Sequence, residues 1–208
     1  MADNVAALVR LMLVTDDRLV EGRDLVALAL AAERGGATSV QLRLKRATPR
    51  EQVERARVLV AALRIPVLVN DRPDVALAAG AAGVHLGPDD LPVTLARRIA
   101  PPGFVIGASA GSVSEAGAAR EADYWGVGPW RASGTKADAG EALGPEGFRQ
   151  LVDVAAGTPC IAIGGVRPDD LRQVLAAGGA GVAVVSGILG EREVEQATRR
   201  YAERWRAV

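Results

Sequence analysis

Ser39-Val40-Gln41-Leu42-Arg43-Leu44-Lys45 reads as a β-strand whose two faces differ in chemistry. Because successive side chains of a strand point in opposite directions, Gln41, Arg43 and Lys45 share one face and the aliphatic residues share the other. If the strand is covered on both sides, its two cations need an anion to meet them. The stretch therefore predicts a polar, phosphorylated ligand at the centre of a buried sheet. The alternative is an edge strand with one solvated face.

Short β-rich runs like this one alternate with helical patterns along the whole chain, at a spacing of ~25 residues. The expected strands are residues 11–15, 39–44, 67–70, 83–86, 105–108, 124–127, 160–163 and 182–185. Eight parallel strands are the number that closes a (β/α)8 TIM barrel, so we predict an α/β fold with a single domain over residues 1–208. An open doubly wound sheet is the alternative, but no Gly-x-Gly-x-x-Gly turn follows the first strand.

Apolar residues at three- and four-residue spacing predict helices between the strands. One such run contains Val53, Ala56, Val60 and Leu63, and the last contains Val194, Ala197, Tyr201 and Trp205. Thr48-Pro49 signals a helix start, and glycines such as Gly36 and Gly80 signal helix ends. We expect no apolar stripe to remain once each helix faces the sheet. The oligomeric state stays open, although a barrel of this size is compatible with a homodimer.

The composition limits the partners of the chain. Lys plus Arg and Asp plus Glu each number 25, so no overall field attracts nucleic acid or an anionic membrane surface. No stretch approaches the ~20 apolar residues of a membrane span. The one cysteine, Cys160, lies in an apolar run, which predicts core packing and a reducing compartment. We therefore expect a cytoplasmic protein that binds small molecules.

Unusual residues collect where the predicted strands end, which is where barrels of this kind place their active sites. They are Lys45, Asn70, Asp71, Asp90, Ser109, Lys136, Gly164-Gly165 and Ser186-Gly187. Glycines at a strand end expose backbone N–H groups and, with the start of a following helix, form an anion site. Gly164-Gly165 and Ser186-Gly187 therefore predict a bound phosphate. A tight strand-to-helix turn is the alternative for Gly164-Gly165.

Asp71 and Asp90 follow neighbouring predicted strands, so their carboxylates are expected to share one hard cation, Mg²⁺. The alternative is that both merely cap helices that begin near Pro73 and Pro92. His85 is the only histidine and lies on the strand before Asp90. A hydrogen-bonded barrel residue is a better interpretation of His85 than a general base or a transition-metal ligand.

Taken together, these motifs resemble the thiamine phosphate synthase family over nearly the whole chain. The most specific ones are Gln41-Leu42-Arg43-Leu44-Lys45 with Asn70-Asp71, Gly83-Val84-His85-Leu86-Gly87, and Gly128-Pro129 before Thr135-Lys136. The resemblance implies a transferase of thiamine biosynthesis. It would condense 4-amino-2-methyl-5-hydroxymethylpyrimidine diphosphate with 4-methyl-5-(2-phosphooxyethyl)thiazole and release diphosphate, with Mg²⁺ as cofactor.

The resemblance also implies roles for individual residues. The pyrimidine diphosphate would be bound by Gln41, Arg43, Lys45, Asn70, Ser109 and Lys136, and Mg²⁺ by Asp71 and Asp90. The thiazole phosphate would be bound by Ser133, Thr135, Gly165, Val185 and Ser186. Lys136, Ser109 and Arg43 would act on the reaction itself, because cations around the diphosphate offset the charge that grows on this leaving group.

Three positions depart from the family pattern: Leu44 stands in place of Glu, Gly111 in place of His, and the loop reads Ala-Ser-Gly-Thr-Lys at residues 132–136. We expect any effect on thiazole affinity rather than on reaction type. Two other functions compete with the synthase. One is a thiazole tautomerase of the same fold, and the other is a catalytically silent phosphate-binding sensor barrel. The complete set of Lys45, Asn70, Asp71 and Asp90 would have no role in the tautomerase, and the metal carboxylates and Lys136 argue against the sensor. The sequence does not tell whether the thiazole is carboxylated.

Overall fold

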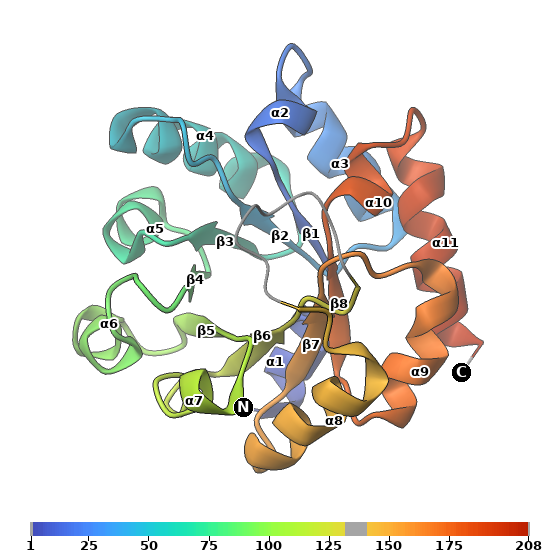
Figure 1. The fold of residues 1–208 in the computed structure, drawn as a ribbon. Coiled ribbons are helices and arrows are strands. Elements are labelled where there is room, and N and C mark those ends of the chain that lie inside the picture. Colours follow the sequence, from blue (N-terminus) through green and yellow to red (C-terminus); the bar gives the residue numbers. More distant parts are fainter. Residues whose placement is uncertain (1, 132–140, 208) are drawn as a thin grey trace.

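Eight parallel strands form a closed barrel in the computed structural model, which describes residues 2–131 and 141–207. Each strand pairs with the next along the chain, and β8 returns to pair with β1 (Figure 1). The strands are β1 (Leu11–Val14), β2 (Ser39–Leu42), β3 (Val67–Asn70), β4 (Gly83–Leu86), β5 (Val105–Ala110), β6 (Tyr124–Val127), β7 (Cys160–Ile163) and β8 (Gly181–Val184). The TIM-barrel prediction is confirmed, and the open sheet is excluded.

Helices surround the barrel, and one of them, α1, lies across its end (Figure 1). They are α1 (Ala2–Leu8), α2 (Asp17–Val20), α3 (Leu25–Gly35), α4 (Pro49–Ala62), α5 (Pro73–Ala79), α6 (Val93–Ile99), α7 (Val113–Ala116), α8 (Gly144–Val154), the 3₁₀ helix η1 (Pro168–Asp170), α9 (Leu171–Ala176), α10 (Ser186–Leu189) and α11 (Val194–Arg206). Within the described residues, none of these helices is long and apolar enough to cross a membrane.

Two hydrophobic layers form the core. The larger one lies between the strands and the helices, and Leu44 belongs to it. The smaller one, the interior cluster, consists of Val9, Met12, Val14, Leu68, Tyr124, Ile161 and Ala183. The two layers follow from the alternation of side chains along each strand, because the barrel leaves one face for its own interior.

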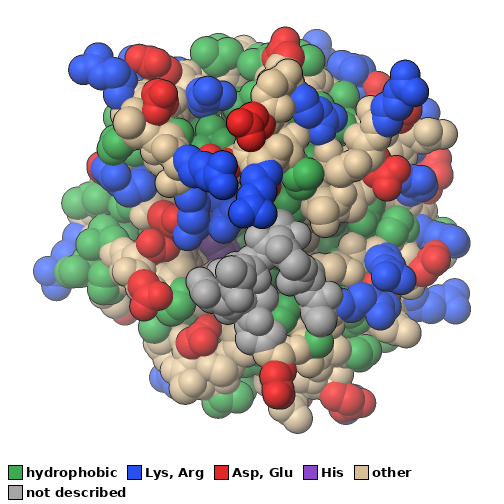
Figure 2. Space-filling model, turned by 45° about the horizontal axis from the view of Figure 1, so that its top comes forward, with side chains coloured by type: hydrophobic (Ala, Val, Ile, Leu, Met, Phe, Trp, Pro, Cys, Tyr) green, Lys and Arg blue, Asp and Glu red, His purple; other side chains and the backbone are tan. Residues whose placement is uncertain are grey.

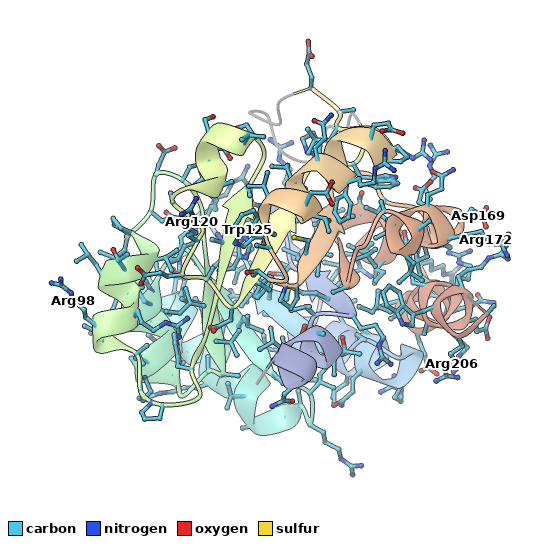
Figure 3. The ribbon with its side chains drawn as sticks, turned by 90° about the horizontal axis from the view of Figure 1, so that it is seen from below. Arg98, Arg120, Trp125, Asp169, Arg172 and Arg206 are labelled. Atoms are coloured by element: carbon cyan, nitrogen blue, oxygen red, sulfur yellow. The ribbon has the colours of Figure 1, made fainter. Side chains whose placement is uncertain are left out.

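Helix α1 was not predicted from the sequence. Its residues Val5 and Leu8 pack against the interior cluster, and in the side view of Figure 3 the helix lies at the lower end of the barrel. A seven-residue segment gives too little periodicity to be recognised as a helix, and burial of these two apolar side chains stabilises it. Helix α1 therefore covers the amino-terminal ends of the strands.

Strand β2 ends at Leu42, two residues earlier than expected. Its neighbour β1 ends at Val14, so the backbone of Arg43 has no further strand to pair with on that side. The hydroxyl of Thr15 replaces the missing strand: it accepts a hydrogen bond from the Arg43 N–H at 2.8 Å and donates one to the Arg43 carbonyl at 3.2 Å. Arg43 consequently keeps a fixed backbone although it lies in a loop.

The expected helix ends are confirmed where they can be compared. Thr48 forms a reciprocal capping box with Glu51 at the start of α4, and Gly36 and Gly80 adopt left-handed conformations just after α3 and α5. The expectation of no leftover apolar stripe is wrong near α6. Leu91, Leu95 and Ile99 recur at four-residue spacing and are 37%, 42% and 52% exposed. They remain exposed because α6 is short and packs against the sheet through other residues, Val93 and Ala96.

Cys160 begins β7 and is 1% exposed, in agreement with its predicted packing role. Burial raises the pKa of its thiol to about 12. At pH 8 only about 10⁻⁴ of a thiol with that pKa is ionised, and the thiolate is the reactive form.

We therefore expect the folded chain to react with iodoacetamide at pH 8 roughly a thousandfold more slowly than the chain unfolded in guanidinium. Mass spectrometry of timed samples measures the rate. Fast labelling of the folded protein would show that Cys160 is accessible and ionised.

Candidate active site

A cavity of about 640 Å³ lies at the carboxyl ends of the strands. The predicted site residues within the described part of the chain all line it: Gln41, Arg43, Lys45, Asn70, Asp71, Asp90, Ser109, Gly165, Val185 and Ser186. Ser133, Thr135 and Lys136 lie outside the described residues. Figure 2 shows Lys and Arg side chains gathered near the centre of this end of the molecule. The fold thus brings the described site residues together, while their individual roles stay predictions.

The segment that follows β1 contacts both basic residues of the opening stretch. Asp16 lies 3.5 Å from a guanidinium nitrogen of Arg43, and both side chains are at most one-fifth exposed. The Asp17 carboxylate accepts the backbone N–H of Lys45 at 2.9 Å. Neither aspartate was predicted from the sequence. The available signal was their place directly after the first strand, beside the strand that carries the cations.

Asp71 and Asp90 lie at the mouth of the barrel, on the side formed by β3 and β4. Asp71 has a positive φ of 65° and its N–H donates to the carbonyl of His85 at 2.8 Å. Asp90 accepts the N–H of Gly87 at 2.6 Å. Helices α5 and α6 begin without a side-chain cap, so the capping alternative for the two aspartates is wrong. Their carboxylates are available to the cavity.

The electrostatics of this carboxylate pair favour a cation. Burial, and next the hydrogen bond with Asp71, raise the pKa of Asp90 to about 6, although the Gly87 N–H and Lys45 act in the opposite direction. Lys45 partly balances the pair, because its ammonium lies 3.3 Å from the Asp71 carboxylate. A metal ion bound between the two carboxylates would stabilise the charged form of both.

Within the described part of the chain, no third His, Cys, Asp or Glu side chain joins the pair. Among residues 2–131 and 141–207, no group of three or more His, Cys, Asp and Glu side chains is placed to hold a metal. This set suits Mg²⁺, which usually takes one or two carboxylates, keeps several waters and completes its shell with substrate phosphates. It does not suit zinc, which needs three or four protein ligands.

The opposite side of the cavity is formed by glycine backbone. Gly164 and Gly165 follow β7 with positive φ angles of 87° and 69°. A side chain at Gly164 would collide with Pro129, since its Cβ would stand 2.8 Å from that ring. Val185 and Ser186 follow the neighbouring strand β8 and line the same part of the cavity. Backbone in this conformation turns successive N–H groups toward one side and so can hold a phosphate.

Asp170 fixes this glycine turn from outside, and it was not predicted from the sequence. The Asp170 side chain is buried, forms an ion pair with Arg131, and accepts the N–H of Arg167 at 2.8 Å. The N–H of Arg131 in turn donates to the Gly164 carbonyl at 2.9 Å. A buried carboxylate therefore connects the segment after β6 to the turn after β7.

Two of the three departures from the family pattern have visible consequences. Leu44 is buried in the layer between the sheet and the helices, where its side chain packs without reaching the cavity. The N–H of Gly111 donates to the carboxylate of Glu115 at 2.8 Å. Glu115 and Glu141 also line the cavity, and neither was predicted. The third departure, residues 132–136, lies outside the described part of the chain.

Comparison with protein families places the chain among known sequences. The model of a family described as thiamine monophosphate synthase matches residues 11–188. A thiamine-phosphate synthase of Methanoculleus marisnigri is 45% identical over 199 residues, which cover 93% of this chain and 94% of the relative. A thiamine-phosphate synthase of Azorhizobium caulinodans is 46% identical over 91% of both chains.

Solved structures give the same result. A thiamine phosphate pyrophosphorylase from Pyrococcus furiosus superposes with a TM-score of 0.87 at 37% identity, over 98% of both chains. A phosphoribosyl anthranilate isomerase from Thermus thermophilus superposes over 95% of this chain with a TM-score of 0.66, at 19% identity. The second likeness concerns the barrel fold alone.

The buried Asp170 gives a stability prediction. Although burial acts against ionisation, hydrogen bonds from Arg131 and the Arg167 N–H lower the pKa of Asp170. A carboxylate with a lowered native pKa stabilises the fold above its unfolded pKa, and this contribution disappears as the pH falls through the native pKa. We expect Asp170→Asn to lower the free energy of unfolding by about 1.5–3 kcal/mol at pH 7, with a smaller difference near pH 3.

Urea unfolding at the two pH values measures this difference. The matched control is Asp169→Asn, because Asp169 is 82% exposed and pairs with Arg204 at the surface. That variant should unfold almost like the unmodified chain. Equal destabilisation by both substitutions would contradict the special role of Asp170.

Proposed function

Because the chain belongs to the thiamine monophosphate synthase family, we propose that its cavity is where a pyrimidine diphosphate and a thiazole phosphate are joined to thiamine phosphate. Family membership makes the chain a transferase of thiamine biosynthesis. In the proposed reaction the C–O bond between the pyrimidine methylene and the diphosphate breaks. The thiazole nitrogen then supplies the electron pair of a new C–N bond, and diphosphate leaves with the electrons of the old bond.

The observation that best supports this proposal is that one cavity is lined on two sides by different groups that are suited to anions. On the side of β2, β3 and β4 lie two cations and two carboxylates, a set suited to a diphosphate with a divalent metal. On the side of β7 and β8 lie the glycine turn and Ser186, a set suited to a single phosphate. A reaction between two phosphorylated molecules needs both sites within one cavity.

Each group acts by binding and by offsetting charge. Arg43 and Lys45 would exchange their ion pairs with Asp16 and Asp71 for contacts with the diphosphate. Asp71 and Asp90 would hold Mg²⁺, which when bound offsets negative charge on the diphosphate oxygens. Gly165, Val185 and Ser186 would hold the thiazole phosphate. The proposed reaction transfers no proton, so the site needs no general base.

Several finer points remain predictions. Ser133, Thr135 and Lys136 are expected in the thiazole and diphosphate sites from the resemblance, and they lie outside the described residues. The homodimer, the cytoplasmic location and the absence of nucleic-acid and membrane partners also rest on the sequence alone. The direct experiment is incubation with both phosphorylated substrates and Mg²⁺, with detection of thiamine phosphate by mass spectrometry. If no thiamine phosphate forms, the proposed function is overturned.

The first prediction of this proposal concerns the metal. Asp71→Asn and Asp90→Asn should each lower kcat/KM by about 10²-fold or more at limiting Mg²⁺, because each removes a charged ligand. Circular dichroism should show an intact fold. Asp89→Asn is the matched control, since Asp89 lines the same cavity but is exposed and has no predicted metal role. Equal activity of Asp90→Asn and Asp89→Asn at every Mg²⁺ concentration would remove Asp90 from the metal site.

The second prediction separates the two substrates. Ser186→Ala should weaken binding of the thiazole phosphate by about tenfold, the value of one hydrogen bond to a charged group, and leave pyrimidine diphosphate binding unchanged. Ser114→Ala, on the exposed side of α7, is the control. Calorimetric titration with each ligand provides the affinities. If both ligands lose affinity equally, the two phosphate sites are not distinct.

A further inference from the structure

Asp16 places a negative charge directly beside one of the two cations proposed for the diphosphate. One of its carboxylate oxygens lies 3.5 Å from a guanidinium nitrogen of Arg43. The Asp16 and Arg43 side chains are 14% and 20% exposed, so water screens the pair only in part. Arg43 lines the cavity, and Asp16 lies behind it, outside the cavity wall. A carboxylate so close to a site for a polyanion opposes the binding of that ligand.

The structural role of Asp16 does not require this charge. Its other oxygen caps helix α2, where it accepts the N–H groups of Arg18 and Leu19 at 3.0 and 3.4 Å. The amide oxygen of an asparagine accepts such bonds as well, and Asn and Asp are about equally favoured at this position of a helix. The second oxygen contacts Arg43. The charge of Asp16 therefore acts on the arginine rather than on the helix.

The residues on either side of Asp16 hold the backbone that carries the two cations. The hydroxyl of Thr15 makes two hydrogen bonds with the backbone of Arg43, at 2.8 and 3.2 Å. The carboxylate of Asp17 accepts the backbone N–H groups of Lys45 and of the next residue at 2.9 and 3.3 Å. Thr15 and Asp17 thus fix the backbone, and Asp16 acts on one side chain only. Loss of the Asp16 charge leaves the Arg43 backbone in place.

We infer that Asp16 sets the affinity of the cavity for diphosphate by competing with it for Arg43. This inference rests on the proposed function, in which Arg43 binds the diphosphate. A guanidinium that turns its donors to a diphosphate has to leave the Asp16 carboxylate. The free energy of the internal ion pair is therefore subtracted from the free energy of ligand binding. Without a ligand, the same pair keeps the long Arg43 side chain ordered.

The competition matters because diphosphate takes part in the proposed reaction twice. It is a portion of the pyrimidine substrate, and it is also a product that has to leave. A contact that is equally strong with the substrate and with the transition state lowers KM without raising kcat. The same contact slows the release of free diphosphate. An internal competitor weakens both, so we expect Asp16 to protect the enzyme against inhibition by its own product.

Calorimetric titration with inorganic diphosphate and Mg²⁺ tests the inference without any turnover. Asp16→Asn keeps an oxygen for the helix cap and removes the charge. Its dissociation constant for diphosphate should be about threefold to tenfold lower than that of the unmodified chain, as expected for a partly exposed ion pair. The gain should shrink at high salt, because salt screens the pair. An unchanged or higher dissociation constant would overturn the inference.

The matched control is Asp24→Asn. Asp24 caps helix α3 in the same way, by accepting the N–H groups of Val26 and Ala27 at 2.9 and 3.0 Å. Among residues 2–131 and 141–207 it forms no ion pair. This variant should bind diphosphate like the unmodified chain. An equal gain in both variants would contradict the inference, since the loss of any negative charge would then suffice.

A double-mutant cycle shows whether Asp16 acts through Arg43. Arg43→Gln should weaken diphosphate binding, because it removes a cation and keeps a polar side chain of similar length. In that background Asp16→Asn should change the dissociation constant by less than about twofold, since no guanidinium is left to compete for. An undiminished gain would mean that Asp16 repels the ligand directly, and the inference would be wrong. It would also be wrong if Arg43→Gln bound diphosphate as tightly as the unmodified chain.

Kinetics connect the binding result with the reaction. In Asp16→Asn the KM for the pyrimidine diphosphate and the inhibition constant of inorganic diphosphate should fall together, while kcat should not rise. A merely structural defect would instead lower kcat and raise KM, and that result would count against the inference. If the unmodified chain makes no thiamine phosphate, the proposed function fails, and the titrations still decide whether Asp16 competes with diphosphate for Arg43.

Discussion

Successive side chains of a strand point to opposite faces, and in a closed barrel one of the two faces has only the interior in which to lie. The rest of this structure depends on that constraint. Gln41 points inward from β2, so Arg43 and Lys45 continue on the same side and line the cavity. Leu44 falls on the other side and packs beneath the helices. A shift of one residue would exchange the two sets and remove the cations from the site.

Charge at the mouth is balanced within the protein before any ligand arrives. Arg43 and Lys45 each lie against an aspartate, and the Asp71–Asp90 pair shares Lys45. Such pairs keep long cationic side chains ordered and reduce the cost of their partial burial. A diphosphate with a divalent cation can replace both partners at once, since it supplies anions to the cations and a cation to the carboxylates. The site is thus matched to a metal-bound anion.

The sequence predicts what depends on local pattern. The strand period was enough to place Gln41, Arg43 and Lys45 together, and glycine punctuation was enough to end α3 and α5. It did not reveal contacts that depend on the register between strands, such as Tyr124 reaching His85 across Gly107. It also missed Asp16 beside Arg43 and Asp170 beside Arg131, because these pairs join segments 27 and 39 residues apart. The short helix α1 has too few residues for a pattern.

Helix α1 and the interior cluster close the barrel at the end away from the mouth. Within the described residues the cavity is therefore closed at its inner end, and its ligands reach it from the mouth of the barrel. Gln41 lies deeper along β2 than Arg43 and Lys45, so a molecule that fills the outer half of the cavity obstructs the route to Gln41. This architecture favours an order of binding in which the ligand that reaches Gln41 binds first and leaves last.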